Sequence, residues 1–233
     1  MARIAYDDGV RTIVATPHVS HDFPTDPSEI AGRVEEVNAA LRAAGVEVQV
    51  VGGAEVALTR LAELDRPAVE LACIGSGSYL LVESPYQYMP DSLERLVFDA
   101  QVAGFRPVLA HPERSGCFHE RLPRLRALVE RGVLTSITAG SVSGRYGKAV
   151  AAQTRAMLSG ELVHDLASDG HGTERRLPRL SVARDRMGAE LFDWSAEAVP
   201  AAMIAGREVP PPPPAPSKGR GLVGALRGLA RRT

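Results

Sequence analysis

The stretch GFRPVLAHPER, residues 104–114, places a histidine directly after a short apolar run. Residues 106–110 have the length and the apolar character of a buried strand, and His111 stands where that strand ends. The same arrangement, an apolar run followed by a His, Glu or Asp, recurs along the chain. It occurs at 11–16 before His18, 47–54 before Glu55, 79–82 before Glu83, and 162–167 before Asp169 and His171.

These predicted strands alternate with helical patterns, and the alternation indicates the fold class. A further strand is expected at 133–138, and amphipathic stretches lie at 27–44, 58–65, 91–103, 120–131 and 146–160. Strands and helices that alternate at this spacing predict an α/β fold with a parallel sheet, either closed as a barrel or open and doubly wound. Residues 172–205 are expected to be mostly helical.

A proline-rich segment ends the predicted domain. Residues 210–216 read PPPPPAP, which predicts an extended spacer because proline cannot donate the hydrogen bonds of a helix or sheet. We therefore predict a domain over residues 1–205, a Pro-rich linker over 206–218 and a basic, disordered tail over 219–233. Leucines recur at helical spacing in that tail, so docking on an anionic membrane is the alternative. Its four glycines disfavour a helix there.

Composition narrows the class of protein. The 233 residues contain no apolar run of membrane-spanning length and no readable signal peptide. The two cysteines are too few for a disulfide framework, so we expect a cytoplasmic protein. The formal net charge of −1 combines an acidic body with a basic segment at 217–233. An acidic body argues against nucleic-acid binding, which requires a basic face.

The residues that follow the strands predict a metal site. The carboxyl ends of parallel strands meet at one edge of a sheet or one rim of a barrel. Each residue alone is more often a solvated or backbone-bonded side chain, but the joint pattern favours a common site for His18, Glu55, Glu83, His111, Asp169 and His171. Imidazole and carboxylate ligands without thiolate suit Zn, Mn or Fe. His21, His119 and His164 lack this setting.

Other catalytic patterns are excluded by counting. A cysteine-dependent phosphatase needs an arginine six positions after its cysteine, and neither Cys73 nor Cys117 has one. The nucleophile elbow G-x-S-x-G is absent, and so are a phosphate-binding P-loop and a complete dinucleotide fingerprint. Metal-dependent chemistry is the remaining interpretation.

Five motifs together resemble one family. GVRTIVATPH, LLVESPY, GFRPVLAHPER, TAGSVSGRYGK and ASDGH occur in this order. They resemble the bacterial capsule and exopolysaccharide protein-tyrosine phosphatases of the polymerase-and-histidinol-phosphatase (PHP) superfamily over residues 1 to about 205. The resemblance implies a distorted, TIM-like β/α barrel with up to three divalent metals, often manganese. It also implies hydrolysis of phosphotyrosine on a membrane-associated tyrosine kinase that controls polysaccharide export.

The resemblance also implies roles for the ligand-type residues. Glu55 would bridge two metals, and Glu83 and His111 would complete one of them. His18 and His171 would hold another metal, and Asp169 would join the remaining one.

Two arginines and a tyrosine complete the expected site. Arg114, three residues beyond His111, is placed to bind a phosphate oxygen with its guanidinium fork. Arg176 matches a second arginine of the family, with Arg175 as a competitor. Tyr86 could line the substrate entrance, although a rim aromatic without function is an equal alternative.

The beginning of the chain departs from the family pattern. Family members begin with a strand that carries H-x-H, and no H-x-H occurs in this sequence. Residues 1–8 instead resemble the end of a helix that Gly9 terminates. We therefore expect a barrel without its first strand, one vacant or weak metal position and reduced hydrolysis. The alternatives are a PHP phosphatase for a small phosphate ester and a non-catalytic binding partner of the kinase.

Overall fold

The fold is built on parallel strands, as the sequence predicts. The computed structural model describes residues 1–85, 92–119 and 121–214. Its larger sheet has the order β2-β4-β5-β6-β7-β8, with every neighbouring pair parallel. The strands are β2 (His18–Val19), β4 (Glu55–Ala57), β5 (Tyr79–Glu83), β6 (Arg106–Ala110), β7 (Leu134–Thr138) and β8 (Asp165–Ala167). A second sheet pairs β1 (Thr12–Ala15) with β3 (Gln49–Gly52), also in parallel.

The strands predicted at 11–16 and 47–54 are present as β1 and β3, and each is followed by a short further strand, β2 or β4, that was not predicted. Pro17 separates β1 from β2, and residues 53–54 separate β3 from β4. Proline has no N–H to donate, so the ladder cannot run unbroken through position 17. The carbonyl of Pro17 instead accepts from the Glu55 N–H at 3.0 Å. His18 and Glu55 consequently begin their short strands as direct partners in register.

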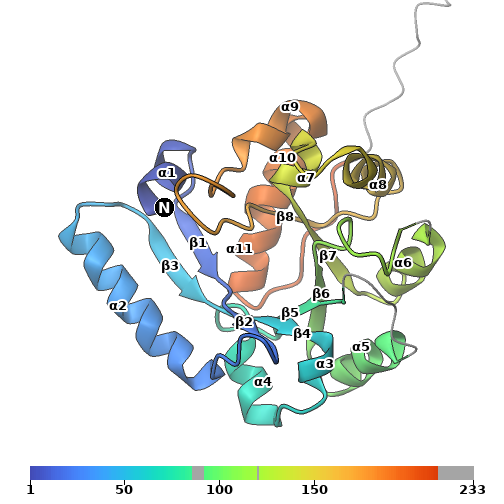
Figure 1. Cartoon of the computed structure of the whole chain (residues 1–233), viewed down its shortest axis with the longest axis horizontal. Coiled ribbons are helices and arrows are strands. Elements are labelled where there is room, and N and C mark those ends of the chain that lie inside the picture. Colours follow the sequence, from blue (N-terminus) through green and yellow to red (C-terminus); the bar gives the residue numbers. More distant parts are fainter. Residues whose placement is uncertain (86–91, 120, 215–233) are drawn as a thin grey trace, which may run out of the picture.

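Helices surround this sheet and follow most of the predicted ranges (Figure 1). They are α1 (Ala2–Asp7), η1 (Pro27–Glu29), α2 (Ile30–Ala43), α3 (Leu58–Leu61), α4 (Arg66–Ala72), α5 (Leu93–Val102), α6 (Leu122–Val129), α7 (Ala139–Ser143), α8 (Lys148–Ser159), η2 (Ser181–Ala183), α9 (Arg184–Met187), α10 (Ala189–Asp193), η3 (Trp194–Ala198) and α11 (Val199–Ile204). The sequence analysis did not predict α4 or α7.

Alternate residues of the strands face two different apolar clusters. Leu80, Val82 and Leu109 belong to a large buried cluster with residues of the surrounding helices. Tyr79 and Val108 belong to a second cluster with residues of η3 and α11, among them Trp194. The sheet is therefore covered on both faces, as parallel sheets require.

Both ends of the described chain are held against the body. Asp8, at the end of α1, accepts hydrogen bonds from the Leu180 and Ser181 N–H groups at 2.7 and 3.0 Å. Gly9 has a left-handed φ of +95°, so the predicted glycine termination of this helix is confirmed. At the other end Tyr79 Oη donates to the carbonyl of Arg207, and Trp194 Nε1 donates to that of Pro210. The predicted basic tail lies outside the described residues.

Gly75 offers a test of how closely α11 packs on the turn that precedes β5. Its φ is +61°, and a Cβ there would lie 2.4 Å from the carbonyl oxygen of Ile204. We expect Gly75→Ala to lower the free energy of unfolding by about 3 kcal/mol, since the clash adds to the left-handed strain. Gly104, with φ of +92° and no described atom within 4 Å, is the matched control. There Gly104→Ala should cost about 1 kcal/mol. Equal losses in urea denaturation would contradict the close approach.

Candidate metal centre

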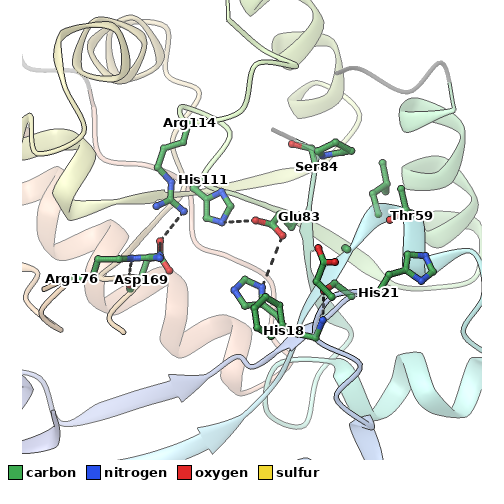
Figure 2. A pocket seen from close by; sticks show the side chains of 15 residues that line it. His18, His21, Thr59, Glu83, Ser84, His111, Arg114, Asp169 and Arg176 are labelled. Carbon is green, nitrogen blue, oxygen red and sulfur yellow. Dashed lines mark hydrogen bonds and ion pairs between the residues drawn. The ribbon is translucent and has the colours of Figure 1, made fainter. Parts of the chain in front are cut away.

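Four of the predicted ligands form one histidine–carboxylate cluster. His18 and Glu55 are paired across β2 and β4, Glu83 is the last residue of β5, and His111 directly follows β6. His111 Nε2 lies 2.7 Å from Glu55 Oε1 and 3.5 Å from Glu83 Oε1. His18 Nδ1 lies 4.0 Å from Glu83 Oε2. Figure 2 shows Glu83 between the two histidines.

In this cluster, neighbouring basic side chains compensate the negative charge of the buried Glu55. Glu55 is 5% exposed, and burial alone would raise its pKa. The hydrogen bond with His111, together with the charges of His111, His18 and Arg114, outweighs burial and lowers the pKa of Glu55 below its usual value. Glu55 is therefore ionised at neutral pH, as a metal ligand must be.

A second group lies beside the first and is built around Asp169. Arg114 Nη2 contacts Asp169 Oδ2 at 2.7 Å, and the Arg176 guanidinium contacts the same oxygen. His171 Nδ1 lies 3.5 Å from Asp169 Oδ1. The His18 and His171 rings are 6.1 Å apart between centroids, so the two groups adjoin. Arg175 is exposed, and Arg176 is the arginine that lines the cavity described next.

The two groups share a cavity of about 390 Å³. Its wall includes His18, Glu83, His111, Arg114, Asp169 and Arg176. Figure 2 shows His18, Glu83 and His111 in the middle of the view, with the Asp169 group to one side and His21 to the other. Within that wall the arginines supply positive charge beside a cluster rich in carboxylates.

The residue set fits a divalent cation. Among the described residues, His18, Glu55 and Glu83 each offer one ligand atom, and these atoms all lie within 4.8 Å of one another. Imidazole nitrogen and carboxylate oxygen suit Mn, Fe or Zn alike, so this donor set does not distinguish them. Asp169 and His171 are not part of this trio.

Three residues of the site have left-handed backbones. His111, Asp169 and Arg176 have φ angles of +34°, +48° and +49°. Non-glycine residues in this region cost about 1–3 kcal/mol each and persist where surrounding contacts impose them. A pattern of apolar residues cannot predict these local backbone conformations.

Glu113 is a buried residue that the sequence analysis did not single out. It lies within the quoted HPER motif and is 0% exposed. Its Oε1 accepts hydrogen bonds from the Thr138 N–H, Thr138 Oγ1 and Ser141 Oγ at 3.0, 3.1 and 2.7 Å. The carboxylate thus ties the turn that carries His111 and Arg114 to the beginning of α7. In the sequence, the position of Glu113 between the candidate site residues His111 and Arg114 is the signal that could have identified it.

The remaining histidines lie in different settings. His21 lines the cavity and lies 3.4 Å from Glu63 Oε1. His164 is half-buried near Trp194, with ring centroids 6.3 Å apart, and its Nδ1 accepts from the Thr135 N–H. His119 does not line the cavity. Tyr86 lies outside the described residues.

Fold and site together define a parallel α/β protein with a candidate divalent-metal centre beside two arginines. Residues 1–197 match the family model for capsular polysaccharide synthesis, CpsB/CapC. The chain belongs to this family.

Named relatives agree with the family assignment. The tyrosine-protein phosphatase YwqE of Bacillus subtilis is 33% identical over 196 residues, which cover 82% of this chain and 77% of YwqE. The tyrosine-protein phosphatase CpsB of Streptococcus pneumoniae is 29% identical over 193 residues, 78% of this chain and 77% of that protein. A chain from the crystal structures of YwqE and CpsB, described as unique metal-dependent tyrosine phosphatases, superposes with a TM-score of 0.79 at 29% identity. That match covers 93% of this chain and 90% of the other.

The Glu113 network predicts a large stability effect. Glu113→Ala leaves three buried donors without their acceptor, so we expect the free energy of unfolding to fall by about 3 kcal/mol. Glu113→Gln keeps an acceptor oxygen and should lose less. Chemical denaturation measures both, with the exposed Glu130→Ala as control. A loss for Glu113→Ala no larger than for Glu130→Ala would contradict the network.

Asp165 predicts a specific pH dependence. Burial raises its pKa from 3.8 to about 6, although Ser136 Oγ donates to its carboxylate. Because the pKa of Asp165 is higher in the folded state than in the unfolded chain, its protonation favours folding. This contribution to the free energy of unfolding is complete below pH 3.8 and is lost as the pH rises through 6. Asp165→Asn should therefore gain up to about 3 kcal/mol relative to the unsubstituted chain between pH 4 and 7.

The contribution of His164 to stability has a pH dependence of the opposite sign. It must be separated from the contribution of Asp165. Burial lowers its pKa to about 4, so its contribution is lost as the pH falls from 6.5 towards 4. Because His164 is present in both proteins, the difference between their unfolding curves in EDTA isolates Asp165. A difference that stays constant from pH 4 to 7 would refute the expectation.

Proposed function

We propose that this chain hydrolyses phosphotyrosine on proteins with the help of divalent metal ions. The observation that carries the proposal is the single cavity in which a histidine–carboxylate cluster adjoins Arg114 and Arg176. The membership of the family and the names of the relatives support the same reaction. Manganese is the proposed metal, with iron or zinc as alternatives that the donor set accommodates equally.

His18, Glu55, Glu83 and His111 would hold the metal, and Asp169 and His171 would extend the site towards the arginines. A divalent cation supplies an ionised water near neutral pH and positive charge for the phosphate oxygens. The carboxylates of Glu55, Glu83 and Asp169 outnumber the two guanidinium groups in this region. The excess of negative charge favours the binding of a cation.

The arginines would bind and orient the phosphate. Arg114 has a side chain only 9% exposed and already contacts one carboxylate oxygen of Asp169. A guanidinium held in this way presents its remaining donors in a fixed fork, which matches a phosphate better than a lysine does. Tyrosinate is a good leaving group, so charge stabilisation by these residues matters more than a strong general acid.

We further propose the distorted PHP-type barrel and a cytoplasmic location. Parallel pairing from β2 to β8 and the adjoining β1–β3 pair support the barrel arrangement. In the described part of the chain no helix is long and apolar enough to cross a membrane, and both cysteines are buried. We also propose a domain over residues 1–205, a Pro-rich linker over 206–218 and a basic tail over 219–233. A membrane-associated tyrosine kinase is the proposed natural substrate.

Hydrolysis of a phosphotyrosine peptide by the 233-residue chain tests the function. We expect release of phosphate with Mn²⁺ and none with EDTA. Glu83→Gln should reduce the rate by about 100-fold or more, because a metal ligand is lost. Arg114→Lys should reduce it roughly tenfold, because the fork is lost. The control is His119→Ala, outside the cavity.

Three results would contradict the proposal. Hydrolysis that persists in EDTA and in Glu83→Gln would exclude a metal held at this cluster. A small aliphatic phosphate ester hydrolysed faster than the phosphotyrosine peptide would favour the metabolite phosphatase instead. Absence of any hydrolysis under these conditions would favour the non-catalytic binding partner.

A further inference from the structure

We propose that Phe23 is a specificity-determining residue that binds the aryl ring of the phosphate ester. The inference rests on the proposed function, since it assumes that the phosphate occupies the cavity beside Arg114. Phe23 would contact the leaving group of the ester. The metal cluster and the arginines bind the phosphate and cannot recognise that group. Phe23 lines the same cavity and is 61% exposed.

The exposure of Phe23 is imposed by a well-bonded turn. The Phe23 N–H donates to Ser20 Oγ at 3.0 Å, and the Phe23 carbonyl accepts from the Ser20 and Thr25 N–H groups, each at 2.9 Å. Val19 and Pro24 form an antiparallel bridge across the same turn. The backbone of Phe23 is therefore fixed, and its ring is held at the entrance of the cavity.

One face of the Phe23 ring is already used. It stacks on the ring of His18, with centroids 5.6 Å apart and an interplanar angle of 29°. The contact sets the orientation of the ring and places it directly beside a candidate metal ligand. Its exposed remainder is apolar surface in the wall of a cavity that also contains the charged side chains of Glu83, Arg114 and Asp169.

The geometry of an aryl phosphate matches this arrangement. With the phosphate at the arginines and the metal cluster, the ester group must point out of the cavity. In phosphotyrosine a phenol ring separates the phosphate from the main chain, and such a ring packs on another aromatic ring in an offset or edge-to-face manner. The single carbon of phosphoserine offers no such surface. Phe23 would therefore favour aryl over alkyl esters.

The test compares aryl and alkyl substrates in Phe23 variants. With phenyl phosphate, Phe23→Ala should raise KM roughly 3- to 10-fold with little change in kcat. With methyl phosphate, KM and kcat should both stay unchanged. Phe23→Tyr keeps the ring and should restore the KM for phenyl phosphate. Phe98→Ala is the matched control, because Phe98 on α5 is 56% exposed and does not line the cavity.

A binding measurement keeps this inference separate from the proposed function. Calorimetry with phenylphosphonate and methylphosphonate, in the presence of Mn²⁺, does not require turnover. We expect Phe23→Ala to weaken the binding of phenylphosphonate roughly 3- to 10-fold and to leave the binding of methylphosphonate unchanged. Equal weakening of both ligands would assign Phe23 a purely structural role through His18, and no weakening would exclude it; either result overturns the inference. A chain that hydrolyses neither ester would overturn the proposed function alone, and the phosphonates would still decide the role of Phe23.

Discussion

The site depends on how buried negative charge is compensated at one edge of the sheet. An ionised carboxylate away from water is costly unless a hydrogen bond or an opposite charge offsets the lost hydration. Glu55 meets this requirement through His111, and Asp169 meets it through Arg114 and Arg176. Each acidic side chain therefore needs a basic partner from a different strand end. That requirement brings segments separated by more than fifty residues into contact.

The backbone provides this pairing in two ways. The parallel register sets His18 against Glu55, and packing on both faces makes the sheet a rigid support. Beyond the strands, left-handed turns at His111 and Asp169 direct side chains that regular geometry would point elsewhere. Glu113 holds one of these turns against α7, so a structural carboxylate supports the position of Arg114, a candidate phosphate-binding residue.

The sequence predicts the strands and the residues at their ends because both are local properties. Strand-length apolar runs and ligand-type residues are visible one segment at a time, and parallel pairing then places His18, Glu83 and His111 together. The short strands β2 and β4 begin beyond the predicted ranges, and they pair His18 with Glu55 in a tertiary register that one segment does not reveal. The partners of Asp169 depend equally on tertiary structure, because Arg114 comes from another turn of the chain. The exposure of Phe23 follows from hydrogen bonds of a loop with no periodic pattern.

Asp169 shows how one carboxylate can serve both halves of such a site. Its Oδ2 receives both arginines, whereas its Oδ1 is the oxygen that faces His171 at 3.5 Å. A carboxylate can accept hydrogen bonds at one oxygen and coordinate a cation with the other, since each oxygen carries its own lone pairs. The contacts with Arg114 and Arg176 orient the carboxylate so that Oδ1 faces His171. Arginines anchored in this way stand next to the histidine–carboxylate cluster, and the charge of Arg114 also helps to lower the pKa of Glu55, so the two groups are electrostatically linked.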